Sequence, residues 1–184
     1  SEKLAHAFLF TGIRGVGKTT IARIIAMGLN CEKKKKPTAN PCLSCSNCKK
    51  ILEDRFEDVL EIDAASNTGV DDVREIISSL KYMPSKGNYK VFIIDEVHML
   101  SNSAFNALLK TIEEPPSFVK FIFCTTEMQK IPITIVSRCQ KYNLNRVSLL
   151  VLSAYLEEIV ELEKLNISKD AIAIIARNSE GSTR

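Results

Sequence analysis

Hydrophobic residues along the chain fall into short unbroken runs that alternate with segments of helical spacing. The runs predict strands at 7–10, 58–63, 90–96 and 119–124. Between them, apolar residues recur at i, i+3, i+4 and i+7, which predicts amphipathic helices. Their apolar faces are Ile21, Ile24, Ile25 and Leu29; Val73, Ile76, Ile77 and Leu80; and Phe105, Leu108, Leu109 and Ile112. Strands that alternate with helices favour an α/β fold with a parallel sheet covered on both faces and ligands at the carboxyl ends of the strands.

Strand patterns stop near Arg146, and two further helical patterns follow. Their apolar residues are Leu149, Leu152, Leu156, Ile159 and Val160 in the first, and Ala171, Ile172, Ile175 and Ala176 in the second. We therefore predict a core domain over residues 1–145 and part of a small helical domain over residues 146–184. Because the chain opens just before a strand and stops within helical sequence, we expect it to be an excised fragment.

A glycine-rich segment, Gly12–Thr19, lies between the first predicted strand and the first predicted helix and reads G-x-x-x-x-G-K-T. Its glycines let backbone N–H groups turn toward a phosphate, and the helix N-terminus adds partial positive charge. Lys18 is expected to reach the β- and γ-phosphates, and the Thr19 hydroxyl to ligate Mg²⁺. The predicted nucleotide-binding residues of this segment are Gly12, Gly15, Val16, Gly17, Lys18, Thr19 and Thr20.

Two acidic residues, Asp95 and Glu96, end the most apolar predicted strand, beside the expected position of the phosphates. Asp95 is expected to hold Mg²⁺ through its water shell, and Glu96 to orient or deprotonate an attacking water. The structural alternative is a pair of acids that caps the next helix. His98 follows two residues later and receives no role. Thr126 ends the next strand, where its hydroxyl could bond the γ-phosphate or the water.

Four of the six cysteines, Cys31, Cys42, Cys45 and Cys48, are spaced C-x10-C-x2-C-x2-C. Four thiolates suit tetrahedral Zn²⁺ and leave no open position for a substrate water, so the predicted site is structural and lies in a module of about residues 31–54. An iron–sulfur cluster and a metal-free cluster are the alternatives. Cys124 and Cys139 stand apart and are expected to be ordinary buried or interface thiols.

Composition and charge exclude few further classes of function. The chain has 184 residues, 45% of them hydrophobic, and a net charge of +3, which is too mild to argue for nucleic acid by itself. No apolar run approaches the roughly 20 residues that cross a membrane. The run Lys33–Lys36 suits a solvated loop, and contact with DNA is the alternative.

Together these motifs closely resemble the γ/τ subunit family of bacterial DNA polymerase III, the AAA+ ATPases of the replicative clamp loader. The resemblance spans essentially the whole chain. It is carried by Gly12–Thr19, the four cysteines, Ile62–Ser66, Ile94–Leu100, Asn106–Pro116 and Ser137–Cys139.

The resemblance implies cofactors, partners and further site residues. Thr126 matches sensor 1, Arg138 the finger that reaches a neighbour's ATP, and Arg184 the sensor 2 arginine of the helical lid. Lys18, Thr19, Asp95 and Glu96 serve ATP, Mg²⁺ and water, and the four cysteines match the family's zinc module. The implied partners are other clamp-loader subunits, further copies of the chain, the sliding clamp and primer–template DNA, in the cytoplasm and without a membrane.

Two other functions remain as rivals to this interpretation. Asp95–His98 also looks like a helicase DExH box, but only one phosphate loop is present. A subunit that binds nucleotide or zinc without turnover would be favoured if Lys18, Glu96 or Arg138 were missing, and all three are present. The family's N-terminal adenine-binding segment and its C-terminal collar are absent from this sequence. We therefore expect the isolated chain to bind ATP weakly, if at all, and to hydrolyse it slowly.

Overall fold

A computed structural model of the chain describes residues 4–66 and 69–183. By compactness it divides into two units, each described by itself here. The first comprises Ser1–Thr11 and Lys18–Tyr142, and the second comprises Gly12–Gly17 and Asn143–Arg184. The expected division into a core domain and a lid domain at residue 145 stays a prediction.

The first unit is a five-stranded sheet flanked by helices, as the sequence predicts for an α/β fold. Its elements are β1 (Ala7–Thr11), α1 (Lys18–Asn30), α2 (Ser46–Leu52), β2 (Val59–Asp63), α3 (Val70–Ser79), β3 (Lys90–Asp95), the 3-10 turn η1 (Val97–Met99), α4 (Asn102–Glu113), β4 (Val119–Thr125), the 3-10 turn η2 (Met128–Lys130), α5 (Ile133–Val136) and β5 (Gln140–Asn143). The strand order is β2-β3-β4-β1-β5.

Strands β1 to β4 pair in parallel, so their carboxyl ends meet at one edge of the sheet. The register places Asp63 opposite Asp95 and Thr11 opposite Thr125. Residues that follow these positions, Glu96 and Thr126, therefore emerge from strands whose ends are aligned. This edge is where the sequence predicts the chemistry.

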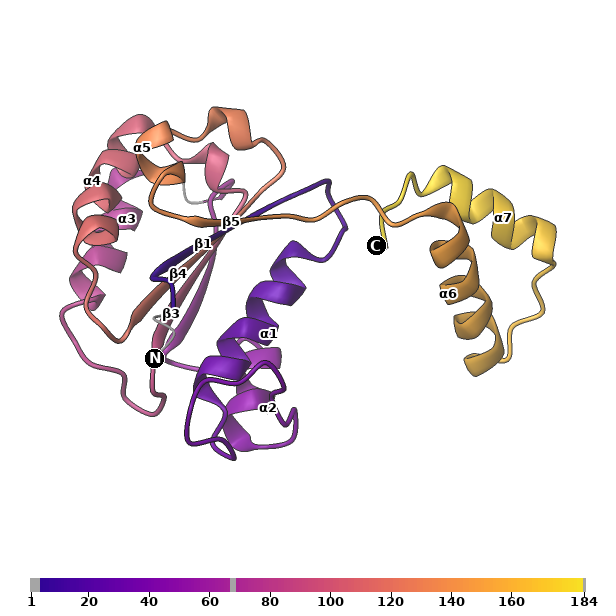
Figure 1. Ribbon diagram of the computed structural model, residues 1–184, viewed down its shortest axis with the longest axis horizontal. Helices are drawn as coiled ribbons and strands as arrows, with labels where there is room; N and C mark the ends of the chain where they lie inside the picture. Colours follow the sequence, from indigo (N-terminus) through magenta and orange to yellow (C-terminus); the bar gives the residue numbers. More distant parts are fainter. Residues whose placement is uncertain (1–3, 67–68, 184) are drawn as a thin grey trace. The chain divides into compact units, whose positions relative to one another are not determined.

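Helices cover both faces of the sheet, with α1 and α2 on one face and α3 and α4 on the other (Figure 1). Alternate strand residues, including Leu9, Phe92, Phe121 and Phe123, join the α3 and α4 side chains in the main hydrophobic cluster. Nearly every residue of the central strands β1, β3 and β4 is buried. Burial on both faces explains why these strands read as unbroken apolar runs rather than as alternating patterns.

The predicted apolar face of α1 is only partly correct. The helix buries Ala22, Ala26, Met27 and Leu29, whereas Ile24 is 41% exposed. Alanines on the buried side let the helix backbone lie close to the sheet, whereas Ile21 and Ile25 are only half-buried. Two short elements, α2 and the edge strand β5, have no apolar pattern that predicts them.

Two contacts fix the position of α1 in the first unit. Arg23 makes a bidentate ion pair with Glu61 of β2, with N···O distances of 2.6 and 2.8 Å. Near the other end, the Thr38 amide donates to the Gly28 carbonyl, and a Cβ at Gly28 would lie 2.3 Å from the Thr38 carbonyl oxygen. Only glycine permits this approach, which packs the insertion between α1 and α2 directly on the helix.

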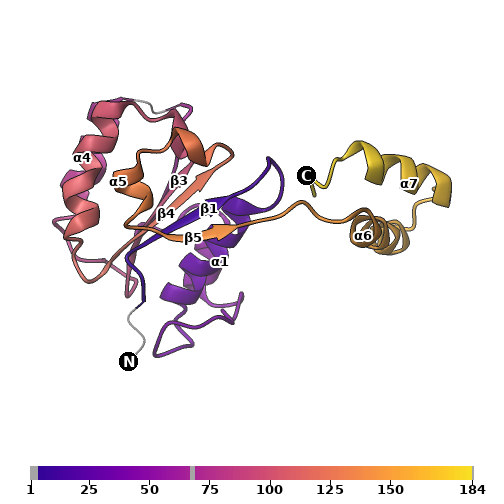
Figure 2. The ribbon, with the colours of Figure 1, turned by 45° about the horizontal axis from the view of Figure 1, so that its top comes forward.

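The second unit contains two helices, α6 (Leu149–Leu162) and α7 (Lys169–Asn178), which pack against each other (Figure 2). Each begins at a serine whose hydroxyl accepts a backbone N–H, Ser148 from Val151 and Ser168 from Ala171. Both helices are where the apolar periodicity predicts them. In α6, however, Leu152 is the only buried member of the predicted apolar face.

Candidate functional site

The segment Gly12–Gly17 has the backbone of a phosphate-binding loop. Gly12, Gly15 and Gly17 have φ angles of +152°, +78° and +95°, which L-residues rarely adopt. A Cβ at Gly12 would also lie 2.5 Å from the Leu144 carbonyl oxygen, so two independent reasons demand glycine there. Within the same unit, Thr183 donates from its amide and its hydroxyl to the Gly15 carbonyl, at 2.9 and 2.8 Å.

Lys18 and Thr19 begin helix α1, directly after this loop in the chain. The Lys18 residue is 5% exposed, and the Thr19 hydroxyl donates to Asp95 Oδ2 at 2.7 Å. This bond joins the first turn of α1 to the end of β3, two segments 76 residues apart in sequence. A hydroxyl and a carboxylate are oxygen donors of the kind that Mg²⁺ takes, the hydroxyl directly and the carboxylate through a bound water, so this pair fits the predicted ion.

Glu96 and Thr126 lie side by side where β3 and β4 end. Glu96 Oε2 accepts from the Thr126 hydroxyl at 3.0 Å and from the Thr126 amide at 3.2 Å. Glu96 is held in the left-handed region at φ 45°, ψ 45°, outside any regular strand or helix. This backbone turn is uncommon for a residue with a side chain, and such conformations cluster at functional sites. The structure therefore brings the predicted residues of this edge together.

Arg138 lies elsewhere in the first unit, after α5. Its guanidinium contacts Glu113 Oε1 at 2.5 Å and the Thr134 carbonyl at 2.6 Å, and the side chain is 37% exposed. The structure therefore places this arginine on the surface, paired with the last residue of α4. Arg184, the predicted sensor 2 residue, lies outside the described residues.

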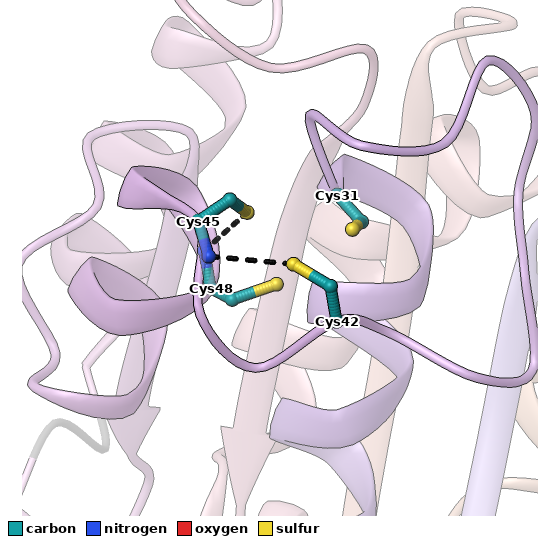
Figure 3. Close-up of side chains that lie close together, drawn as sticks. All are labelled: Cys31, Cys42, Cys45 and Cys48. Carbon is teal, nitrogen blue, oxygen red and sulfur yellow. Dashed lines mark hydrogen bonds between the residues drawn. The ribbon is translucent and has the colours of Figure 1, made fainter.

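The four predicted zinc ligands form one cluster (Figure 3). Their sulfur atoms lie within 4.8 Å of one another, and they come from the end of α1, the following loop and the start of α2. With Zn–S bonds of about 2.3 Å, a tetrahedral site needs sulfurs about 3.8 Å apart, so four converging thiols at this spacing fit the ion. The Cys45 amide faces Cys42 Sγ at 3.3 Å, and the Cys48 amide faces Cys45 Sγ at 3.4 Å.

Thiol acidity differs across the six cysteines. A backbone hydrogen bond at Ser44 is the main reason that the pKa of Cys42 falls to about 5, whereas burial raises the pKa of Cys48 to about 12. Away from the cluster, burial raises the pKa of Cys139 to about 12 and that of Cys124 still further. Cys124 and Cys139 are buried, as the sequence analysis expects, and their raised pKa makes them poor nucleophiles.

Buried polar side chains tie the cysteine module to the loop that enters β3. The Asn47 side chain donates to the Asn30 carbonyl, and Asn30 Oδ1 accepts from the amides of Asn88 and Tyr89, both at 2.9 Å. Asp58, which is 2% exposed, accepts from three successive amides of the same loop. These anchors escaped the sequence analysis, because a single Asn or Asp carries no periodic signal.

His98 also belongs to the edge of the sheet with Glu96 and Thr126, although its sequence position alone gave it no role. It lies in η1, two residues beyond Glu96, and its ring approaches both Glu96 and Glu127. Its position in a tight turn directly after a strand that ends in two acids is the signal that could have identified it.

Comparison with known proteins places this arrangement in a family. A model of the family described as "DNA polymerase III, delta subunit" matches residues 1–148. Over 182 residues the chain is 50% identical to the DNA polymerase III subunit tau of Escherichia coli, which covers 99% of this chain and 28% of that protein. It is 49% identical to the tau subunit of Bacillus subtilis, covering 100% of this chain and 32% of that protein. It is 48% identical to the gamma subunit of Buchnera aphidicola, covering 99% of this chain and 49% of that protein.

Solved structures show the same fold at lower identity. The RuvB Holliday junction branch migration motor of Thermotoga maritima is 22% identical with a TM-score of 0.64, covering 98% of this chain and 51% of that chain. A DNA polymerase III gamma subunit-related protein from the same organism is 23% identical with a TM-score of 0.54. The match covers 98% of this chain and 55% of that chain.

The parallel sheet flanked by helices, with a phosphate loop after its first strand, confirms the predicted α/β fold, and these solved structures share that fold. The chain belongs to the DNA polymerase III subunit family that its residues 1–148 match, and the predicted resemblance to the tau and gamma subunits is confirmed over nearly its whole length. The chain spans between about a quarter and a half of the length of the curated relatives that it matches. Among the described residues, no helix is both long and apolar enough to span a membrane.

Proposed function

We propose that this chain binds and hydrolyses ATP as the motor part of a bacterial replicative clamp loader, which places the sliding clamp on primed DNA. The observation that carries the proposal is the pair of bonds at the sheet edge, Thr19 to Asp95 and Thr126 to Glu96. Thr19 and Asp95 are the pair suited to Mg²⁺, and Thr126 and Glu96 are the pair suited to activating water. The identity of about 50% to tau and gamma subunits supports the same function.

Each side chain has a distinct task in this proposal. Lys18 and the loop amides hold the phosphates, while Thr19 and Asp95 hold Mg²⁺, which neutralises charge on the transferring phosphoryl group. Glu96 orients the attacking water and accepts its proton. Thr126, as sensor 1, donates a hydrogen bond to the γ-phosphate from the end of β4, beside Glu96. Arg184 would approach the same nucleotide as sensor 2.

Arg138 acts on a neighbouring subunit in this proposal. It lies on the surface, where its guanidinium pairs with Glu113 and the Thr134 carbonyl. An arginine supplied in trans stabilises charge that develops on the equatorial oxygens and is worth roughly 10³–10⁵ in rate. Its neighbours in the assembly are therefore further copies of the chain and other loader subunits. The assembly acts on the sliding clamp and primer–template DNA, and it works in the cytoplasm. The cysteine cluster holds structural zinc.

ATP turnover by the intact subunit assembled with its loader partners tests this function. We expect primed DNA together with the clamp to stimulate turnover strongly, and single-stranded DNA alone to stimulate it little. Lys18→Ala should abolish the stimulation. Full stimulation by single strands, with no effect of the clamp, would instead identify a translocase.

A further inference from the structure

His98 occupies an enclosed position between two carboxylates that the proposed chemistry does not explain. Its side chain is 6% exposed and lies in η1, the turn that links β3 to α4. Buried polar side chains normally have a partner, and a buried histidine between acids must be placed by specific contacts.

The imidazole contacts two different strand ends. Nδ1 lies 3.3 Å from Glu96 Oε2 and 3.0 Å from the Thr125 hydroxyl, and Nε2 lies 3.4 Å from Glu127 Oε1. Glu96 follows β3, whereas Thr125 ends β4 and Glu127 comes two residues later. His98 therefore joins the residue proposed to activate water to the segment that carries Thr126.

The contacts on Glu96 fall on one oxygen. The Thr126 hydroxyl, the Thr126 amide and His98 Nδ1 all approach Oε2. Within residues 4–66 and 69–183, both hydrogen bonds to the Glu96 carboxylate fall on Oε2 and none on Oε1. One carboxylate oxygen is therefore fixed by the protein, and the other is left to take a proton from water.

We propose that His98 is a positioning residue that keeps the Glu96 carboxylate in its reactive orientation when Thr126 engages a phosphate. This inference rests on the proposed ATPase function. A hydroxyl has one proton, so Thr126 cannot donate it both to Glu96 Oε2 and to a phosphate oxygen. Once the hydroxyl turns away, the imidazole is the side chain that still holds Oε2.

Glu127 orients the imidazole from the opposite side. Its Oε1 accepts from Lys130 at 2.8 Å, and its amide donates to the Thr125 hydroxyl at 3.0 Å. The hydrogen bond from Lys130 is the main cause that lowers the pKa of Glu127, and the charge of Lys130 and the nearby His98 ring add to it. An ionised Glu127 is a fixed acceptor for Nε2–H, which sets the angle of the ring. Nδ1 can donate to Glu96 at the same time only when both ring nitrogens carry a proton, so the proposed bridge is an imidazolium held between two carboxylates.

The first test separates binding from turnover in the full-length subunit assembled with its partners. We expect His98→Ala to lower kcat about tenfold, because a displaced Glu96 is a misaligned base, and to leave nucleotide affinity within about twofold. His98→Gln should lose about threefold, since an amide can replace one of the two contacts. The matched control is His6→Gln, the other histidine of the chain, which should behave as wild type. Unchanged kcat in His98→Ala would overturn the proposal.

The second test needs no nucleotide. NMR of the imidazole nitrogens in the free protein should show Nδ1 shifting in Glu96→Gln and Nε2 shifting in Glu127→Gln, with neither shifting in Glu57→Gln. A ring that responds to neither variant would contradict the bridge. If the wild-type assembly bound no ATP while the ring still responded, the proposed function would fail and the bridge between the strand ends would stand.

Discussion

At the scale of single residues, a few buried polar side chains organise segments that no apolar pattern marks. Asp58 is the clearest case, because its two oxygens accept from the amides of Ser85, Lys86 and Gly87, each at 2.7 Å. Burial alone raises the pKa of Asp58, but these three amide bonds more than offset it and lower the pKa below its ordinary value. Its charge therefore stabilises the fold.

We predict that Asp58→Asn destabilises the first unit by about 2 kcal/mol at neutral pH, since an amide nitrogen would face donors now held by carboxylate. Because the folded pKa lies below the unfolded one, the contribution is complete above the unfolded value and is lost as pH falls through the folded value. The difference between variant and wild type in denaturant unfolding should thus shrink below about pH 4.

Its neighbour Glu57 provides the control. Glu57 is exposed and bonds only Lys86 and Ser85 through their side chains, so Glu57→Gln should leave the unfolding midpoint unchanged. Equal effects of the two substitutions would mean that buried amide bonds are not what distinguishes Asp58.

At the scale of elements, the insertion between α1 and β2 brings its four predicted zinc ligands together. Helix α2 has seven residues, and its N-cap is Cys45, one of the four predicted ligands. Isolated helices of this length are not stable in water, so its folding depends on tertiary contacts and on whatever holds the thiols together.

We predict that Cys48→Ser lowers zinc content from about one ion per chain to near zero, because three thiolates bind Zn²⁺ far more weakly than four. Amide exchange should then accelerate across residues 31–54, and in the 85–89 loop that Asn30 holds. Metal analysis and hydrogen exchange measure both effects. Cys139→Ala, a buried cysteine outside the cluster, should keep its zinc. Iron with visible absorbance in place of zinc would contradict the assignment.

The elements also show where sequence reasoning succeeds and where it fails. The buried strands β3 and β4 were predictable because burial on both faces leaves an unbroken apolar run. The edge strand β5 has four exposed residues and no such run, and it is placed instead by Tyr142, whose ring stacks on Phe8 and Phe10. Helix α2 was missed because its position depends on thiols and not on periodicity.

The candidate site also contains residues that the sequence predicts and residues that it does not. Lys18, Thr19, Asp95 and Glu96 were predictable because their chemistry requires fixed residue types at strand and helix ends. The position of His98 just after the two acids was a usable signal, but its pairing with Glu127 was not predictable, because it depends on how two strand ends converge in space. Such long-range contacts leave no spacing rule in the sequence.

At the scale of the whole molecule, the proposed ATPase takes one residue of each site, an arginine, from a neighbouring subunit. Arg138 contacts Glu113 of its own chain and is partly exposed, so it is available to an adjoining surface once that pair opens. Arg55, an exposed arginine that only approaches Glu53 at 3.6 Å, is the matched control for its removal.

The most direct measurement compares ATP affinity with single-turnover hydrolysis in the assembled full-length protein, for wild type, Glu96→Gln and Arg138→Ala. We expect all three to bind ATP within about threefold, because neither residue holds the phosphates in the ground state. Hydrolysis should fall at least about 100-fold in Glu96→Gln and about 1,000-fold in Arg138→Ala, with Arg55→Ala unchanged. Hydrolysis at the wild-type rate in Glu96→Gln would contradict the central claim that the aligned ends of β3 and β4 form the catalytic site.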